Sequence, residues 1–149
     1  MPLVSTKLIE FTKKSEGEVR LSNGNHKLYK CPADKYTIGY GFNIEDNGLP
    51  EDIAEILINR QLFESKYMLS ENVNCWLELS AERQDVLIDM CYNMGWPTLS
   101  KFKKMFAALE AADYNEPAEQ MKDSKWYRDV DVRAEKLILT MKTNEWHER

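Results

Sequence analysis

The chain has 149 residues, a length typical of one domain or of two small lobes. Hydrophobic residues make up 43% and charged residues 30%, which excludes a disordered or fibrous protein. The formal net charge is −5, whereas a general nucleic-acid-binding protein would be basic. No apolar run approaches the ~18 residues of a membrane-spanning helix. We therefore expect no nucleic-acid partner and no stable membrane insertion.

The charge is distributed unevenly along the chain. Residues 1–30 have a net charge of +3, residues 31–100 a net charge of −8, and residues 101–149 are balanced. Residues 1–14 interleave Lys and Glu with apolar residues, without the uninterrupted apolar core of a signal peptide. We therefore expect a protein that is made in the cytoplasm.

The cysteines and histidines do not have the spacing of a metal site. Cys31, Cys75 and Cys91 are odd in number, and His26 and His147 are far apart in the sequence. A disulfide framework, a metal site and a cofactor are therefore not expected. Each cysteine can instead be a small residue of the hydrophobic core.

A short helix is expected over residues 7–15. Ser5 or Thr6 provides its N-cap, and Gly17 ends it. This helix at 5–15 is expected to pack on a helical lobe later in the chain.

A small antiparallel sheet is expected in residues 16–49. Asn23-Gly24 is typical of a hairpin turn, and residues 28–31 and 36–41 are expected to be strands with a turn at 32–35 between them. Such a sheet of two or three strands is too small to be stable alone.

The rest of the chain is predicted to be helical. Pro50 begins a strongly periodic stretch, and a helix from Pro50 to about Ser70 would be roughly 30 Å long, enough to connect two lobes. Further helices are expected at 81–93 (behind a Ser80 cap), 99–112, 117–123 and 131–142.

The predicted fold class is α+β and mainly α, in a single domain over 1–149. A small β lobe (16–49) would be joined by a connecting helix (50–71) to a helical lobe (72–149). A cleft between two such lobes is a natural ligand site.

The run Thr37-Ile38-Gly39-Tyr40-Gly41 is the most informative short motif. In a strand, Thr37, Gly39 and Gly41 would share one face. Two positions without side chains would let a bulky ligand approach the backbone. The alternative is a glycine-kinked edge strand that binds nothing.

Glu16 is expected at the C-terminal end of the first helix. The negative end of the helix dipole and an apolar neighbourhood would both favour the protonated form of this carboxyl group. A protonated carboxyl near neutral pH can protonate a leaving oxygen, so Glu16 is a candidate general acid.

Cys31 and Thr37 are separated by five residues. If all five form the hairpin loop, Cys31 lies opposite Thr37; a four-residue loop would instead pair Cys31 with Tyr36. The sequence leaves both registers open.

With these motifs, the chain resembles the phage-type lysozymes (glycoside hydrolase family 24), which include the T-even phage endolysins, over nearly its whole length. The segments that carry the resemblance occur in the same order: Ser15-Glu16-Gly17, Tyr29-Lys30-Cys31, residues 36–41, Asn93-Met94-Gly95, Ser124-Lys125-Trp126-Tyr127, Arg133-Ala134 and Thr143-Asn144-Glu145-Trp146.

The resemblance implies hydrolysis of the β-1,4 bond between N-acetylmuramic acid and N-acetylglucosamine in peptidoglycan. It implies that Glu16 is the general acid, that Cys31 and Thr37 complete a catalytic triad, and that Arg133 lies near Glu16. The substrate-binding residues would be Gly39, Gly41, Tyr92 and Asn93. The alternative for Tyr92 and Asn93 is packing at a helix end.

Three features depart from the family pattern. The segment between Glu16 and Cys31 is longer than in compact members, with the insertion around residues 23–26. The second catalytic position is Cys31 where the T-even enzyme has Asp. Phe42 replaces the histidine that usually follows the glycines.

The resemblance also implies a monomer that binds the peptidoglycan glycan strand. It would be made in the host cytoplasm and act on periplasmic peptidoglycan after a partner, a hole-forming membrane protein, permeabilises the membrane. Two alternatives remain: a lytic transglycosylase acting on the same bond, and a catalytically silent wall-binding or morphogenetic module.

Overall fold

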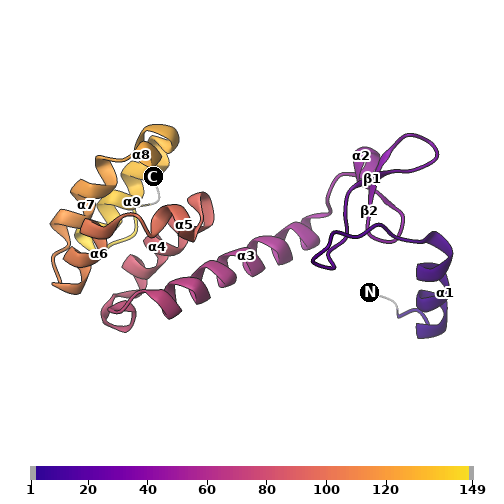
Figure 1. The fold of residues 1–149 in the computed structure, drawn as a ribbon, viewed down its shortest axis with the longest axis horizontal. Helices are drawn as coiled ribbons and strands as arrows, with labels where there is room; N and C mark the ends of the chain where they lie inside the picture. Colours follow the sequence, from indigo (N-terminus) through magenta and orange to yellow (C-terminus); the bar gives the residue numbers. More distant parts are fainter. Residues whose placement is uncertain (1–2, 148–149) are drawn as a thin grey trace. The chain divides into compact units, whose positions relative to one another are not determined.

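The computed structural model of the chain describes residues 3–147 (Figure 1). The fold is α+β and mainly helical, as the sequence predicted. It divides into two compact units, and the division falls between Glu55 and Ile56. This point lies within the long helix α3 (Glu51–Asn72).

The first unit begins with helix α1 (Thr6–Glu16). The Ser5 hydroxyl caps the helix by accepting a hydrogen bond from the Leu8 amide at 3.2 Å. Gly17 ends it with a φ of +74° and donates its N–H to the Lys13 carbonyl. The predicted cap and end are thus confirmed, and Glu16 is the last residue of the helix.

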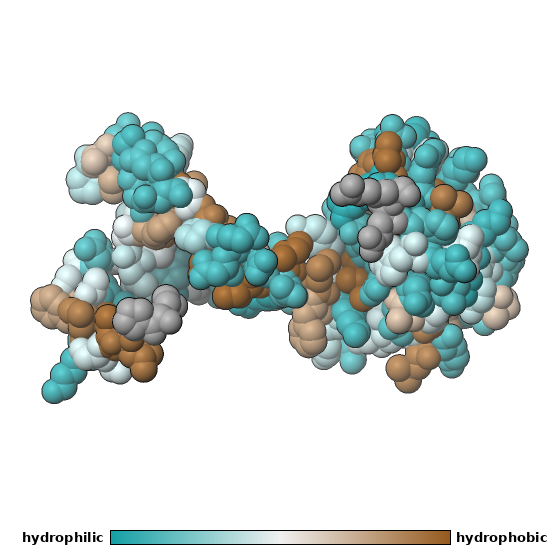
Figure 2. All heavy atoms as spheres, turned by 180° about the vertical axis from the view of Figure 1, so that it is seen from behind, coloured by the Kyte–Doolittle hydropathy of each residue, from teal (hydrophilic) through white to brown (hydrophobic). Residues whose placement is uncertain are grey.

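The apolar residues of α1 stay exposed. Leu8, Ile9 and Phe11 are 54%, 40% and 69% exposed. Figure 2 shows hydrophobic side chains over this end of the chain. The packing of α1 on the helical lobe stays a prediction.

A three-stranded antiparallel sheet follows in the order β1-β2-β3. The strands are β1 (Tyr29–Lys30), β2 (Tyr36–Ile38) and β3 (Phe42–Asn43). The expectation of one strand over 36–41 was wrong, because residues 39–41 form the turn between β2 and β3.

The turn at residues 39–41 depends on its two glycines. Gly39 has a φ of +68° and Gly41 a φ of +86°, a region that L-residues with side chains rarely adopt. Gly39 and Gly41 therefore do not line a strand face with Thr37, and that part of the sequence interpretation is corrected.

Two helices complete the path out of the sheet. The short helix α2 (Ile44–Asn47) is capped by the Asn43 side chain, which accepts from the Asp46 amide. Helix α3 begins at Glu51, one residue later than predicted. Pro50 precedes the helix, and its carbonyl accepts hydrogen bonds from the amides of Ile53 and Ala54.

The second unit contains the remaining helices of the described chain. Their bounds are η1 (Trp76–Glu78), α4 (Ala81–Met94), α5 (Trp96–Leu99), α6 (Lys103–Glu110), α7 (Asn115–Lys122), α8 (Lys125–Val130) and α9 (Val132–Thr143). Ser80 caps α4 as predicted, by accepting from the Arg83 amide. The single helix expected at 99–112 was wrong, because residues 100–102 interrupt it.

The hydrophobic core lies in the second unit. Helices α4, α6, α7 and α9 pack together. Fully buried side chains come from each of these helices and from α3 and α5: Leu69, Leu87, Met90, Leu99, Met105, Met121 and Met141. No helix within residues 3–147 is both long and apolar enough to cross a membrane.

Candidate active site

Glu16 meets the turn between β2 and β3. A Cβ atom added to Gly41 would lie 2.7 Å from Glu16 Oε2, closer than real Cβ contacts come. Gly41 also has a φ of +86°. The absence of a side chain therefore lets the backbone of the turn approach the Glu16 carboxylate. The sequence associated Gly41 with close approach by a ligand, whereas the structure places the side chain of Glu16 there.

The register of β1 and β2 differs from both alternatives drawn from the sequence. Tyr29 pairs with Thr37, Lys30 with Tyr36, and the Cys31 amide donates to the Lys35 carbonyl at 3.0 Å. The connecting loop therefore has three residues (32–34).

The tight loop depends on Asp34. This residue takes a φ of +61°, and its amide donates to the Cys31 carbonyl at 2.8 Å. Asp is among the residues that tolerate this left-handed conformation. A longer loop was expected from the sequence, because no local signal assigned this conformation to Asp34.

Cys31 and Thr37 nevertheless lie close together. Cys31 is opposite Lys35, so Thr37 is its diagonal neighbour on the same face of the sheet. Hydrogen bonds from the backbone of Lys35, and then from the backbone of Ala33 and the Thr37 side chain, lower the pKa of the Cys31 thiol against the opposing effect of desolvation. Cys31 is therefore more readily deprotonated than an ordinary cysteine.

This electrostatic difference predicts selective alkylation of Cys31. Only the thiolate reacts, so the alkylation rate of Cys31 should rise with pH around a midpoint below that of a free cysteine. Desolvation by burial raises the pKa of Cys75 and of Cys91, so both should stay unmodified in the folded protein. Mass spectrometry after timed iodoacetamide treatment at several pH values measures all three. Faster labelling of Cys75 or Cys91 than of Cys31 would contradict the prediction.

Thr37 is the one buried residue among those described in the first unit, at 2% exposure. Its hydroxyl donates to the Lys35 carbonyl at 2.9 Å, so its oxygen lone pairs remain available as acceptors. The Thr37 side chain is therefore tied to the backbone two residues before it.

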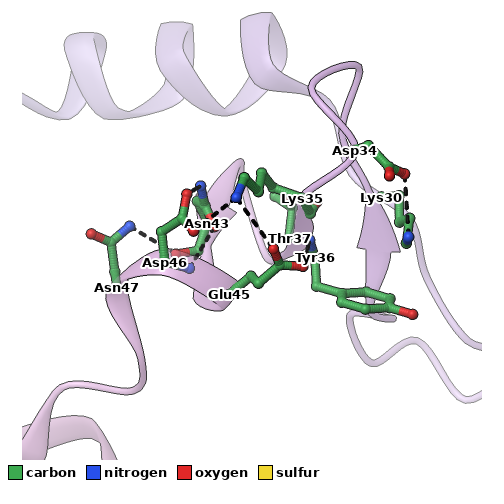
Figure 3. A network of polar contacts seen from close by, with 9 residues as sticks. All are labelled: Lys30, Asp34, Lys35, Tyr36, Thr37, Asn43, Glu45, Asp46 and Asn47. Atoms are coloured by element: carbon green, nitrogen blue, oxygen red, sulfur yellow. Dashed lines mark hydrogen bonds and ion pairs between the residues drawn. The ribbon is translucent and has the colours of Figure 1, made fainter.

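A polar network holds β2 and the residues around Thr37 in place (Figure 3). The Lys35 ammonium pairs with Asp46 at 3.2 Å and Glu45 at 3.4 Å, and the Tyr36 amide donates to Glu45 at 3.2 Å. These bonds join β2 to helix α2. The bonds to Asp46 and Glu45 raise the pKa of Lys35. The pKa of Asp46 is lowered, first by the hydrogen bond from the Asn43 side chain and then by the bond to Lys35.

Arg133 lies in the second unit, at the start of α9. Its guanidinium binds Asp89 of α4 through two bonds, Nη2–Oδ1 at 2.5 Å and Nε–Oδ2 at 3.0 Å. The hydrogen bond to Asp89 raises the pKa of Arg133, with a smaller contribution from Tyr92. Asp89 was not predicted from the sequence as part of the site. Its position one helical turn before Tyr92, on the same side of α4, was the available signal.

The Arg133–Asp89 pair is expected to couple α4 and α9 energetically. Both side chains are partly exposed, 43% for Arg133 and 26% for Asp89, so the coupling should be modest, about 0.5–1 kcal/mol. A double-mutant cycle with Arg133→Ala and Asp89→Ala, read by urea denaturation, measures it. The coupling should shrink as salt is added. Strict additivity at low salt would show that the pair contributes nothing.

Tyr92 and Asn93 lie in the last turn of α4 and line different hollows of the second unit. Tyr92 lines a hollow of about 320 Å³ with Gln61 and Ser65. Asn93 lines one of about 370 Å³ with Lys125 and Trp126, whose buried Nε1 has no hydrogen-bond partner. Within residues 3–147, no group of His, Cys, Asp or Glu side chains is arranged to hold a metal ion.

Comparison with known proteins gives the family of this chain. Residues 20–139 match the family model described as phage lysozyme, a span that includes Cys31, Thr37 and Arg133 and begins after Glu16. The chain is 24% identical to "Probable T4-type lysozyme 2" of Dictyostelium discoideum, over 78% of this chain and 86% of that protein. It is 29% identical to "Pre-baseplate central spike protein Gp5" of Enterobacteria phage T4. That match covers 46% of this chain and only 12% of that protein. Because the family match covers most of the sequence, the chain belongs to the phage lysozyme family and is a lysozyme-type peptidoglycan hydrolase.

Proposed function

We propose that this protein hydrolyses the β-1,4 bond between N-acetylmuramic acid and N-acetylglucosamine, and so lyses bacterial cells. One observation carries the proposal. The first unit contains the Glu16 carboxylate close to Gly41 of the glycine turn, and it contains the Cys31 thiol next to the buried Thr37 hydroxyl. A glycosidase needs a proton donor for the leaving oxygen and a second group for the water or the anomeric carbon.

Glu16 serves as the proton donor. Its proton passes to the glycosidic oxygen, which leaves as O4 of the N-acetylglucosamine unit when the bond to the anomeric carbon breaks. Gly41 leaves room for the carboxylate, because a Cβ atom at this position would lie 2.7 Å from Glu16 Oε2.

Cys31 and Thr37 serve the attacking water. The Thr37 oxygen accepts a hydrogen bond from the water through its lone pairs. The Cys31 thiolate takes the second proton while the water oxygen bonds to the anomeric carbon of N-acetylmuramic acid. The lowered pKa of Cys31 increases the fraction of this thiolate near neutral pH. The reaction inverts the anomeric configuration, from β to α.

Product stereochemistry tests the role of Cys31. Proton NMR of soluble glycan strands during the first minutes of digestion should show the α-anomer of the new N-acetylmuramic acid end before mutarotation. The β-anomer would overturn the role as base. It would instead indicate attack by Cys31 on the anomeric carbon, with a covalent glycosyl–cysteine intermediate.

Product identity tests the bond specificity. Peptidoglycan digested by the protein and then reduced with borohydride should yield reduced N-acetylmuramic acid ends in mass spectra. Reduced N-acetylglucosamine ends would place the cleavage at the other glycosidic bond. Anhydro-muramic ends would indicate a lytic transglycosylase, and the release of no sugar would indicate a wall-binding module.

A further inference from the structure

Backbone hydrogen bonds hold together residues 19–27, the inserted hairpin of the first unit. The amide of Lys27 donates to the Val19 carbonyl at 2.8 Å, and that of Leu21 to the Asn25 carbonyl at 2.8 Å. Asn23-Gly24 makes the turn, as the sequence predicted, with Gly24 at a φ of +90°. Arg20 and His26 face each other across this hairpin as a bridge pair.

The hairpin holds one side chain of the β2–β3 turn, Tyr40. Nη2 of Arg20 donates to the Tyr40 hydroxyl at 3.2 Å, and the same guanidinium is fixed by the Gly24 carbonyl at 2.7 Å and the Glu18 carboxylate at 2.5 Å. The imidazole of His26 packs on the Tyr40 ring, with centroids 4.8 Å apart at an interplanar angle of 76°. This edge arrangement is favoured for aromatic pairs.

Helix α1 holds the same ring. The Lys13 ammonium lies 5.3 Å from the Tyr40 centroid, within the range of a cation–π interaction. Lys13 lies less than one helical turn before Glu16 on α1. Tyr40 is therefore tied both to the hairpin and to the helix that ends at Glu16.

The contacts of Tyr40 can affect the Glu16 carboxylate because Tyr40 is the neighbour of Gly41 in the chain. Tyr40 directly precedes Gly41, where an added Cβ atom would lie 2.7 Å from Glu16 Oε2. A displacement of Tyr40 would move Gly41 relative to the Glu16 carboxylate. An error of about 1 Å in the placement of a catalytic group can lower a rate on the order of 10²-fold.

We propose that Tyr40 is a positioning residue for Glu16, and that the inserted hairpin holds Tyr40 in place through Arg20 and His26. This inference rests on the proposed function of Glu16. It gives the insertion a role in placing the general acid, because its two bridge-paired residues both contact the tyrosine.

Substitution of Tyr40 tests the proposal. Tyr40→Ala should lower kcat about 10–100-fold with KM changed less than threefold. Tyr40→Phe keeps the ring contacts and loses the bond to Arg20, so it should recover most of that loss. In the Glu16→Gln background, Tyr40→Ala should cause no further loss, because the group that it positions is absent.

Two control variants separate positioning from general destabilisation. Ser5→Ala removes the N-cap of α1 and should lower the urea midpoint of unfolding with kcat unchanged. Lys27→Gln removes a charge from the same hairpin at a side chain that makes none of the contacts above, and should also leave kcat unchanged. A loss of kcat in Ser5→Ala as large as in Tyr40→Ala would overturn the proposal.

A readout independent of activity separates this proposal from the proposed function. In protein carrying ¹³C-labelled glutamate, Tyr40→Ala should shift the Glu16 carboxyl resonance, whereas Lys27→Gln should not. A wild-type protein without hydrolase activity would contradict the proposed function, and the resonance would still report on positioning. An unchanged Glu16 resonance in Tyr40→Ala would overturn the positioning role.

Discussion

Replacement of Glu16 by Gln should lower kcat/KM on peptidoglycan by about 10²–10⁴-fold, the range that a general acid contributes. The amide has nearly the shape of the carboxyl group, so the contact with Gly41 should persist and the protein should fold. The variant loses only the proton that the leaving oxygen needs. Initial rates of dye release from labelled peptidoglycan, with circular dichroism at the same concentration, measure both properties.

A matched substitution identifies the effect as specific. Glu119→Gln makes the same chemical change at an exposed carboxylate of α7 and should leave the rate within twofold of wild type. Hydrolysis by Glu16→Gln at more than a tenth of the wild-type rate would sink the assignment of Glu16 as the general acid.

The second large effect is expected from Gly41→Ala. The new methyl group would lie 2.7 Å from Glu16 Oε2, so the carboxylate or the turn must move. The φ of +86° adds backbone strain of about 1–2 kcal/mol. We expect a loss of kcat of about 10²-fold, together with a lower midpoint in urea denaturation.

Gly48→Ala is the control for backbone strain. Gly48 has a φ of +67°, and a Cβ atom there would meet nothing within 4 Å. It should lose a similar 1–2 kcal/mol of stability but keep its activity. If the two variants lose equal activity, the cause is instability of the first unit, and the contact between Gly41 and Glu16 has no catalytic importance.

The sequence predicted the parts of the fold that depend on local signals. Ser5 and Ser80 are N-caps, Gly17 ends α1, and Asn23-Gly24 forms a turn, because each effect needs only neighbouring residues. Short elements were harder to predict. Helix α8 has six residues and follows α7 closely, so its few apolar positions make no clear period.

The geometry of the candidate site was harder to predict than the local positions of its residues. Glu16 at a helix end follows from local signals alone, whereas the sequence left open whether Cys31 lies near Thr37. The observed register did not follow from the sequence, because Asp34 adopts a left-handed conformation that shortens the loop. The contact between Gly41 and Glu16 joins two segments far apart in the chain, and no local pattern encodes such a pairing.

Isotope incorporation from water distinguishes the proposed hydrolysis from its alternatives. The wild-type protein digests purified peptidoglycan in H₂¹⁸O, the new ends are trapped at once with borohydride, and mass spectrometry locates the label. Hydrolysis as proposed places one ¹⁸O on C1 of each new N-acetylmuramic acid end. Released sugars without the label, or with the label on N-acetylglucosamine ends, would contradict the account.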